Sequence, residues 1–289
     1  MKAPKFSFVR ADSVAHALEL LERHGDDARI LAGGQSLMPT LNMRLSQPEL
    51  LIDINRLDAL KGISVEGGVV RIGALTRHAE VMDSPIVARH LALIAEAMPH
   101  VAHVAIRNRG TFGGSVALAD PAAEMPACVL ALGATLVVES VQGRREIAAE
   151  EYFKGLYETA RRPDELLVEA LIPVETPGSV SVFMELARRH GDFAIAGLAC
   201  RARVAGDVLS DVRLVYFASE DAPRLATGAM AAVEGKGWTE ATRAAALAAL
   251  DSDLDPMANL DGSAAMKLHL QRVLTGRALD AAVERARAA

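Results

Sequence analysis

Cysteine is nearly absent from this chain, and the shortage limits the chemistry that the chain can perform alone. The 289 residues include two cysteines, Cys128 and Cys200, and both lie in apolar stretches. Two separate thiols predict buried, reduced side chains, as in a cytosolic protein. They do not supply the four protein ligands that an iron–sulfur cluster generally needs. If this protein transfers electrons, any metal centre must therefore lie on another chain.

Three further absences narrow the class of protein. The sequence has no apolar run of about 18 residues or more, so no transmembrane segment is predicted. The first five residues lack the apolar stretch of a signal peptide, and we expect a cytoplasmic protein, with contact to the inner membrane face left open. Basic residues are scattered and the formal net charge is −6, which predicts no nucleic-acid partner.

The first half of the chain alternates short strands with helices. Asp12 or Ser13 caps a first helix that Gly25 ends. Helical segments are also predicted at residues 38–45 and, opened by Pro85, at residues 85–98. Strands are predicted at residues 29–32, 51–54, 69–72 and 166–172, with a hairpin at 135–141 and 144–147.

A segment with Pro177 and Gly178 marks a boundary near residues 174–179. Helices capped by Thr239 and Ser263 are predicted at residues 240–250 and 264–274, and Gly276 is expected to end the second. The order of elements predicts an α+β fold followed by a small antiparallel sheet with helices. The strands of that sheet are predicted at residues 182–187, 194–204 and 208–218.

The first of two glycine pairs directly follows a predicted strand, in Leu31-Ala32-Gly33-Gly34-Gln35-Ser36. Because glycine has no Cβ, backbone N–H groups here can approach a phosphate closely. The Ser36 hydroxyl can donate to a phosphate oxygen. The segment lacks the motifs of a P-loop and of the dinucleotide fingerprint. A plain tight turn between strand and helix explains these residues equally well.

The second glycine pair lies in Thr111-Phe112-Gly113-Gly114-Ser115, and two carboxylates, Asp120 and Glu124, follow it. Two such glycine loops suggest one extended ligand with phosphates, held from both sides. A phosphate site alone would rarely place two acidic groups there, because like charges repel. A ligand that also carries sugar-like hydroxyls explains the mixture. The alternative, of equal weight, is that Asp120 caps a helix beginning at Pro121.

Four segments together resemble the FAD-binding medium subunit of the molybdenum hydroxylases, the family of xanthine dehydrogenase and carbon monoxide dehydrogenase. They are residues 31–37, 106–115, 119–124 and 188–194, in the order of the family. The resemblance implies a two-lobed, PCMH-type FAD-binding domain at residues 1–176, with lobes at about 1–58 and 59–176. It implies a small C-terminal domain, with an antiparallel sheet and helices, at residues 177–289.

The resemblance also assigns residues to the cofactor. The first glycine segment would bind the FAD diphosphate through main-chain N–H groups, and the second would form the opposing wall. Glu124 would hold ribityl hydroxyls, while Asp192 and Phe193 would lie near the isoalloxazine ring. The implied FAD-binding residues are Leu31, Ala32, Gly33, Gly34, Gln35, Ser36, Thr111, Gly113, Gly114, Ser115, Asp120, Glu124, Asp192 and Phe193.

Three positions depart from the family pattern. Ser115 stands where Asn is usual, which keeps a hydroxyl but removes an amide. Phe193 stands where Tyr is also common, so no phenol is available there. Glu185 stands near a position that is often Lys, which leaves part of the adenine side open.

The resemblance implies an electron-transfer subunit of an oxidoreductase, with no catalytic residue and no metal site on this chain. A molybdenum-cofactor large subunit would oxidise the substrate. Two [2Fe–2S] clusters on a small subunit would pass electrons to FAD, and FAD to an external acceptor. The expected assembly is a heterotrimer that dimerises. A self-contained FAD oxidase or reductase of a related fold is the alternative, and a docking scaffold without FAD is a third possibility.

Overall fold

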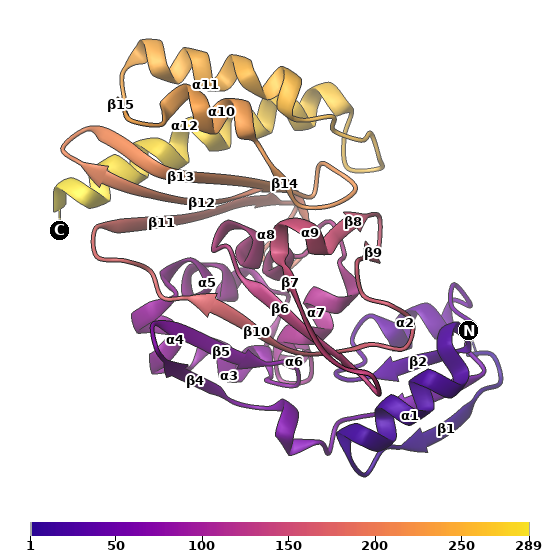
Figure 1. The fold of residues 1–289 in the computed structure, drawn as a ribbon. Coiled ribbons are helices and arrows are strands. Elements are labelled where there is room, and N and C mark those ends of the chain that lie inside the picture. The colour runs from indigo at the N-terminus through magenta and orange to yellow at the C-terminus, as the bar shows by residue number, and fades with distance from the viewer. Residues whose placement is uncertain (1, 289) are drawn as a thin grey trace.

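The computed structural model describes residues 2–288 and stacks three main sheets in chain order (Figure 1). The first is parallel, with strand order β1-β3-β2. Its central strand is buried at all four positions, as expected for a parallel strand covered on both faces. No helix in the described range is long and apolar enough to cross a membrane. The strands are β1 (Ser7–Arg10), β2 (Ala28–Leu31) and β3 (Leu50–Asp53).

Helix α1 (Val14–His24) packs its apolar stripe against this first sheet. The Ser13 hydroxyl accepts the His16 N–H at 3.1 Å and Gly25 follows the last residue, so both predicted ends are confirmed. A 3-10 turn, η1 (Gly25–Asp27), leads into β2, and α2 (Leu37–Asn42) follows the first glycine pair. The short segment after the predicted strand is therefore helical, as expected.

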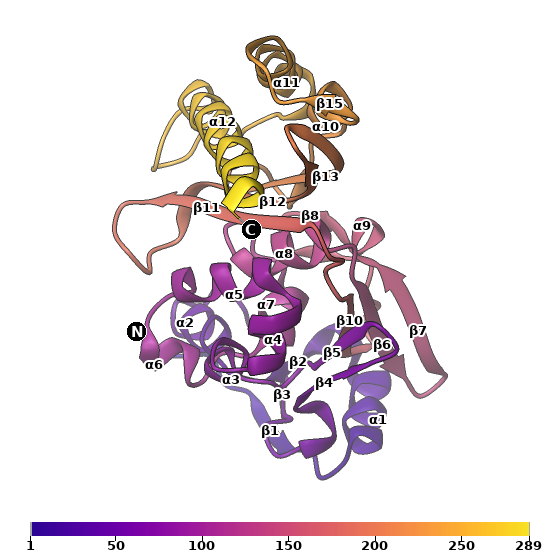
Figure 2. The same ribbon diagram turned by 90° about the vertical axis from the view of Figure 1, so that its left-hand side faces the viewer.

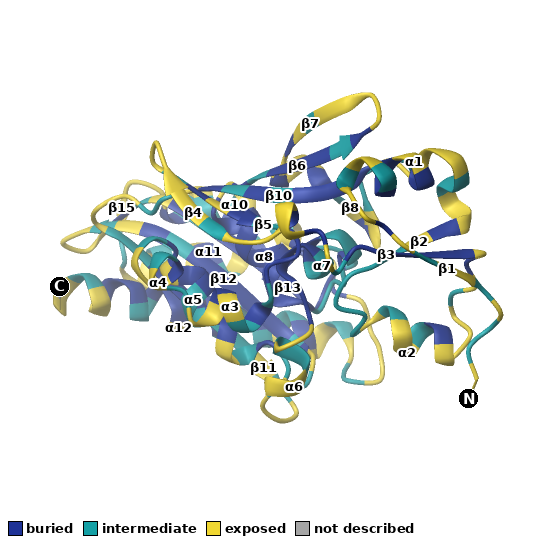
Figure 3. Ribbon diagram, turned by 90° about the horizontal axis from the view of Figure 1, so that it is seen from below, coloured by how far each residue is buried: buried dark blue, intermediate teal, exposed yellow. Residues whose placement is uncertain are grey.

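The second sheet is antiparallel, with strand order β4-β5-β10-β6-β7. The predicted hairpin is confirmed as β6 and β7. Figure 3 shows that the edge strands β4 and β7 carry most of the exposed positions of this sheet. The strands are β4 (Ile63–Glu66), β5 (Val69–Gly73), β6 (Thr135–Ser140), β7 (Gly143–Ala148) and β10 (Leu166–Pro173).

Short helices cover one face of the second sheet and share its hydrophobic core. A two-stranded ribbon of β8 (Phe153–Gly155) and β9 (Glu158–Thr159) follows them. The helical segments are η2 (Asp58–Leu60), α3 (His78–Met82), α4 (Pro85–His90), α5 (Ala92–Ala97), η3 (Met98–His100), α6 (Val104–Arg107), α7 (Phe112–Leu118), α8 (Glu124–Ala131) and α9 (Ala149–Tyr152).

The single helix predicted at residues 85–98 is wrong, because the chain breaks at Leu91 into α4 and α5. The segment after β10 forms hydrogen bonds with backbone groups at this point in place of the helix. The N–H of Glu175 donates to the carbonyl of His90 at 3.1 Å, and the Glu175 carboxylate accepts the N–H of Ala92. A contact from more than eighty residues away (positions 91 and 175) therefore decides where this helix ends.

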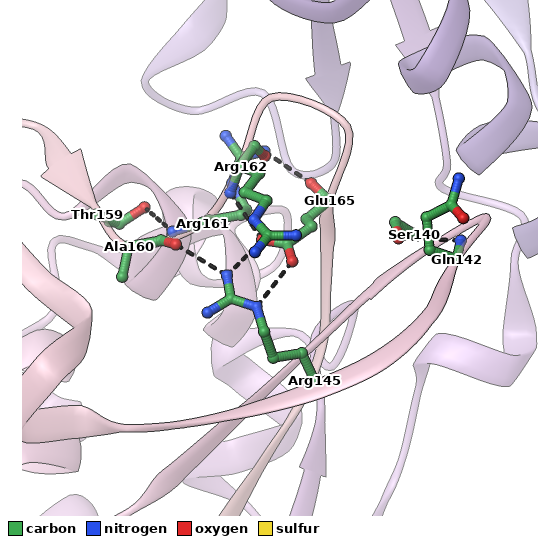
Figure 4. Close-up of polar contacts among 8 residues, drawn as sticks. All are labelled: Ser140, Gln142, Arg145, Thr159, Ala160, Arg161, Arg162 and Glu165. Carbon is green, nitrogen blue, oxygen red and sulfur yellow. Dashed lines mark hydrogen bonds and ion pairs between the residues drawn. The ribbon is translucent and has the colours of Figure 1, made fainter.

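An ion-pair network around Arg145 fixes the second sheet to the loop that precedes β10 (Figure 4). Arg145 Nε and Nη2 donate to the two carboxylate oxygens of Glu165 at 2.9 and 2.7 Å. Glu165 also accepts the N–H of Arg162 at 2.7 Å, and its side chain is 4% exposed. Arg145 and Glu165 already neutralise each other, so we assign this pair to stability and to no ligand.

We expect Glu165→Gln to lower the free energy of unfolding by about 2–3 kcal/mol at pH 7, because it removes a charge-assisted pair. Burial acts to raise the pKa of Glu165, but the hydrogen bonds from Arg145 and Arg162 outweigh it and hold the pKa below 4.5. The contribution is therefore present above about pH 4.5 and is lost as the pH falls further. Urea unfolding at pH 7 and at pH 3 measures both effects. Exposed Glu146→Gln is the control, and an equal loss in both variants would contradict the assignment.

The third sheet is antiparallel and lies between the rest of the chain and the C-terminal helices. Figure 2 shows α12 over β12 on the side away from α8. Alternation along β13 explains this sandwich, since Leu214 and Tyr216 enter the helical core while Val215 and Phe217 enter the core of the second sheet. The elements are β11 (Ser179–Ala187), β12 (Ala194–Ala205), β13 (Val208–Phe217), β14 (Arg224–Leu225), β15 (Lys236–Gly237), α10 (Thr227–Val233), α11 (Glu240–Asp253) and α12 (Ala264–Ala288).

The end predicted for the last helix at Gly276 is wrong, because α12 runs on to Ala288. Gly276 permits a close contact within the helix pair instead. A Cβ at Gly276 would lie 2.6 Å from Nη2 of Arg243, whose guanidinium bonds both carboxylate oxygens of Asp280. Gly276 thus lies where the Arg243 side chain of α11 crosses α12, and the cap that Thr239 provides for α11 is confirmed.

Candidate functional site

A cavity of about 1020 Å³ opens at the carboxyl end of the parallel sheet. Its walls come from the ends of all three strands, from α2 and from the segment between α6 and α7. Five of the predicted cofactor residues, at positions 31–35, line it, whereas Ser36 does not. The full lining is Phe8, Arg10, Leu31, Ala32, Gly33, Gly34, Gln35, Met38, Pro39, Asn42, Asp53, Asn55, Arg77, Ile106, Asn108 and Arg109.

Asn55 holds the first glycine segment in place. Its Nδ2 donates to the carbonyl of Ala32 at 2.7 Å and to that of Leu31 at 3.2 Å. Its Oδ1 accepts Nη2 of Arg77 at 2.7 Å, and Arg77 also donates to the carbonyl of Arg109. One side chain thus ties the first glycine segment to the loop that leads into α7.

The first glycine pair has two different reasons to be glycine. A Cβ on Gly33 would lie 2.3 Å from the carbonyl oxygen of Arg109 and 2.7 Å from the Cα of Gly110, so the two loops touch backbone to backbone. Gly34 has φ +71°, a conformation that favours glycine. Within the described residues, the N–H groups of residues 33–36 donate to no protein acceptor. Four consecutive donors are therefore available for a ligand.

The charge inside the cavity is positive overall. Asp53 is neutralised by Arg10, whose Nε lies 2.9 Å from Oδ2, while Arg77 and Arg109 also line the wall. The Arg109 guanidinium makes no hydrogen bond or ion pair within residues 2–288. Burial, with the charge of Arg107, lowers the pKa of nearby His78 to about 4, so this ring adds no charge at pH 7. Free N–H donors beside two arginines suit a phosphate-bearing anion.

The loop predicted at the second glycine pair is wrong, because the pair forms the first turn of α7. The Thr111 hydroxyl caps this helix by accepting the N–H of Gly114 at 3.1 Å. A Cβ on Gly113 would lie 2.4 Å from the Cβ of Ala74, so this glycine permits close packing on the second sheet. Neither Gly113 nor Gly114 lines the cavity, and Ser115 sits one residue further into the helix.

Asp120 and Glu124 lie at the far end of α7. The alternative in which Asp120 caps a helix from Pro121 is wrong, because α8 begins at Glu124 after an uncapped Ala123. Asp120 instead accepts the N–H of Ala122 at 2.9 Å and the hydroxyl of Tyr157 at 3.3 Å. Ala119, in the left-handed region at φ +53°, ends α7 and turns the chain toward these carboxylates.

Glu124 belongs to a cluster that we call the carboxylate cluster: Glu124, Glu185 and His100. Glu185 Oε1 lies 3.2 Å from Nδ1 of His100, and the Glu185 side chain is 4% exposed. The hydrogen bond to Glu185 raises the pKa of His100. Burial, with the like charge of Glu185, raises the pKa of Glu124 to about 7. The resemblance implied that Glu185 stands near the adenine side, but Glu185 does not line the cavity.

We expect Glu124→Gln to stabilise the chain without FAD at pH 8. The folded carboxyl binds its proton more tightly than the unfolded one, so stability falls as the pH rises from about 4.5 to about 7. The loss above pH 7 is on the order of 3 kcal/mol, and glutamine avoids it. Thermal melts of both proteins at pH 4.5 and pH 8 measure this effect. If the variant is no more stable than wild type at pH 8, ionisation of Glu124 does not destabilise the folded chain.

Asp192 and Phe193 lie in the turn between β11 and β12, beside the carboxylate cluster. His190 in that turn faces His100 with ring centroids 6.1 Å apart, and a Cβ on Gly191 would lie 2.7 Å from the carbonyl of Ala102. Asp192 pairs with Arg189 at 3.0 Å, and Phe193 is 66% exposed. Phe193 therefore presents its aromatic ring to solvent.

The predicted residues therefore form two groups joined by α7. Residues 31–35 line the cavity and Glu124 lies in the carboxylate cluster, while Thr111, Gly113, Gly114 and Ser115 belong to α7 itself, which is about 10 Å long. The sequence reasoning missed Asn55, Arg77 and Arg109, which complete the first group. For Asn55 a signal existed, because it follows β3, and ligands gather at the carboxyl ends of parallel strands.

Comparison with known proteins decides the family. The model of the FAD binding domain in molybdopterin dehydrogenase matches residues 4–175, and that of the CO dehydrogenase flavoprotein C-terminal domain matches residues 181–282. The chain belongs to the FAD-binding medium subunits of the molybdenum hydroxylases. This medium subunit is therefore one component of an oxidoreductase, and its family relatives are subunits of multi-subunit enzymes.

Similar proteins span the whole medium subunit. Subunit alpha of the 6-hydroxypseudooxynicotine dehydrogenase complex of Paenarthrobacter nicotinovorans is 41% identical, with 99% of this chain and 97% of that one covered. Carbon monoxide dehydrogenase from Hydrogenophaga pseudoflava has a chain with TM-score 0.96 at 38% identity, and 99% of both chains is covered. Quinoline 2-oxidoreductase from Pseudomonas putida 86 has one with TM-score 0.93 at 36% identity, again with 99% of both chains covered.

Proposed function

We propose that this medium subunit binds one FAD along α7 and relays electrons from [2Fe–2S] clusters of a small subunit to an external acceptor. The observation that carries the proposal is the set of four free N–H groups at residues 33–36, beside Arg77 and Arg109. This donor set fits a diphosphate, because backbone N–H groups and guanidinium groups are the usual partners of phosphate oxygens. FAD supplies the redox chemistry when it is bound.

Each group of residues has its own part in this proposal. The cavity would take the diphosphate and adenosine half, with Gly33 and Gly34 allowing close approach. Thr111 and Gly113 would act mainly by shaping the start of α7, and Ser115 would face the cofactor from it. Glu124, with Asp120, would accept hydrogen bonds from ribityl hydroxyls, and Asp192 and Phe193 would lie against the ring. No side chain here needs to act as an acid or a base.

The proposed assembly is a heterotrimer, with a molybdenum-containing large subunit and a [2Fe–2S] small subunit, that dimerises. Its support is the medium-chain status of the relatives and the cysteine count, since two cysteines do not supply the four ligands that an iron–sulfur cluster generally needs. The proposed division of this subunit is an FAD-binding region at residues 1–176 and a C-terminal domain at 177–289. We propose a cytoplasmic location, since reduced thiols suit that compartment.

Native mass spectrometry of the complex purified through this subunit tests the proposal. We expect three kinds of chain, with FAD released from this one on denaturation. When the complex is rapidly mixed with the large subunit's substrate, the iron–sulfur clusters should gain electrons before the flavin absorbance falls. A subunit that purifies alone, holds FAD and oxidises an organic donor would favour the self-contained oxidase. A complex with no flavin would leave only the scaffold interpretation.

A further inference from the structure

A groove lies between α11 and α12, two helices that cover the third sheet on the side away from the first half of the chain (Figure 1). Its volume is about 360 Å³, and it shares no residue with the cavity at the first glycine segment. We call it the arginine groove. Basic and apolar side chains line it together, namely Arg243, Leu247, His269, Arg272, Val273 and Arg277.

The lining residues recur at the period of a helix. On α12, His269, Val273 and Arg277 are four residues apart, and on α11 so are Arg243 and Leu247. Residues at this spacing share one face of a helix, so each helix contributes one continuous stripe to the groove. The stripe on α12 is about 12 Å long, which matches about two turns of a helix laid along it. Leu247 and Val273, both half-buried, supply the apolar contact.

One end of the arginine groove is fixed by the surroundings of Arg243. Its Nη1 donates to the two carboxylate oxygens of Asp280 at 2.9 and 2.8 Å, and its guanidinium lies 5.8 Å from the ring centroid of Trp238. A Cβ on Gly276 would lie 2.6 Å from Nη2. Glycine within a helix costs about 1 kcal/mol relative to alanine. The chain therefore gives up helix stability at the point where this arginine is held in place.

The charges of the groove select among anionic partners. Arg277 is exposed and makes no hydrogen bond or ion pair within residues 2–288, whereas Arg272 is paired with Asp251 and Arg243 with Asp280. The two aspartates would repel the dense negative charge of a lipid surface. A lone phosphate would meet only one unpaired guanidinium. A single carboxylate beside an apolar side chain fits both the free cation and the apolar residues next to it.

We propose that the arginine groove docks an acidic amphipathic helix of a neighbouring subunit. An apolar residue of that helix packs on Leu247 and Val273, and a carboxylate one turn away pairs with Arg277. Arginine is enriched at protein interfaces, and a helix in a groove is anchored at positions three or four residues apart. The inference goes beyond the proposed function and rests on it only for the presence of partner subunits.

Cross-linking of the intact complex tests the contact. Arg277→Lys keeps the positive charge and introduces a primary amine, which carbodiimide joins to a carboxylate in direct contact with it. We expect one dominant cross-link to an Asp or Glu of another subunit, with apolar residues three or four positions away on the same helix. Arg89→Lys changes an exposed arginine of α4 in the same way, and as the matched control it should not give that cross-link.

Charge reversal gives a second measurement. Arg277→Glu places like charges against each other in the docked state, so we expect about a tenfold loss of complex that survives gel filtration after dilution. Because Arg277 is exposed and does not line the cavity, the melting temperature and the FAD content per chain should stay unchanged. Arg89→Glu is the control and should leave the complex intact.

Three outcomes would contradict the inference. If the complex forms but Arg277→Lys gives no cross-link to another subunit, or Arg89→Lys gives the same one, the groove docks no such helix. If phosphatidylglycerol vesicles carry the wild-type complex in flotation but not Arg277→Glu, the occupant is a lipid surface. A chain that purifies without partners would overturn the proposed function, and the docking inference with it.

Discussion

Gly33→Ala is expected to abolish retention of FAD. The new Cβ would lie 2.3 Å from the carbonyl oxygen of Arg109, and backbone atoms on both sides leave no flexible end to move. The first glycine segment must then separate from the loop before α7, which moves the four free N–H groups away from Arg77. The ratio of flavin to protein absorbance after gel filtration of the purified complex measures the loss, which we expect to exceed 90% of the bound flavin.

Gly73→Ala is the matched control for this prediction. A Cβ there would lie 2.5 Å from the carbonyl oxygen of Leu60, an equally severe backbone contact outside the cavity. Neither glycine has a positive φ, so both substitutions cost stability for the same steric reason. We expect both variants to melt at lower temperature and only Gly33→Ala to lose flavin. Loss of flavin in both would mean that general destabilisation explains the result.

Arg77→Met is expected to weaken FAD by 10- to 100-fold, or about 1.5–3 kcal/mol. The substitution keeps the bulk of the side chain but removes a cation from the cavity wall. It also removes the hydrogen bond to Asn55 at 2.7 Å, which holds the first glycine segment. Because part of the effect is electrostatic, the difference from wild type should shrink as salt rises. Fluorescence titration of the flavin-free chain at two salt concentrations measures both the loss of FAD affinity and its dependence on salt.

Arg71→Met is the matched control, because it removes an arginine that does not line the cavity. Arg71 pairs with Glu169 across β5 and β10, outside the cavity, so its loss changes the net charge equally. We expect FAD affinity in Arg71→Met within a factor of two of wild type. If the two variants bind FAD equally, Arg77 has no direct part in the site. If Arg77→Met is insensitive to salt, its role is to hold the loop and not to neutralise phosphate.

Local signals predicted most of the regular structure. Ser13 and Gly25 bound α1 because a capping hydroxyl and a following glycine act within a few residues. The strand predicted at residues 208–218 is confirmed by β13. The failures came from distant contacts. Glu175 ends α4, and Arg243 explains Gly276, and in both cases the partner is remote in sequence.

The sequence indicated those parts of the candidate site that one continuous segment supplies. It did not indicate the parts that the fold brings together from distant segments. The first glycine segment was found because its donors are consecutive backbone groups. The second glycine segment was predicted with the wrong conformation, because Thr111 caps a helix that begins at Phe112 and includes both glycines. Arg77 carries no local sign of its role, because a bridge to Thr111 brings it to the cavity. Glu185 and His100 meet only when β11 packs on the first half.

The two-faced third sheet has a consequence for how the chain can be divided. Val215 and Phe217 complete the core beneath α8, while their neighbours Leu214 and Tyr216 complete the core beneath α12. Cutting the polypeptide near residue 176 would remove a wall from the core of the first piece and expose, in the second piece, the face of the sheet that carries Val215 and Phe217. Unfolding of one half should therefore unfold the other. Although two family models divide the chain near this point, we expect the two halves to unfold as one cooperative unit.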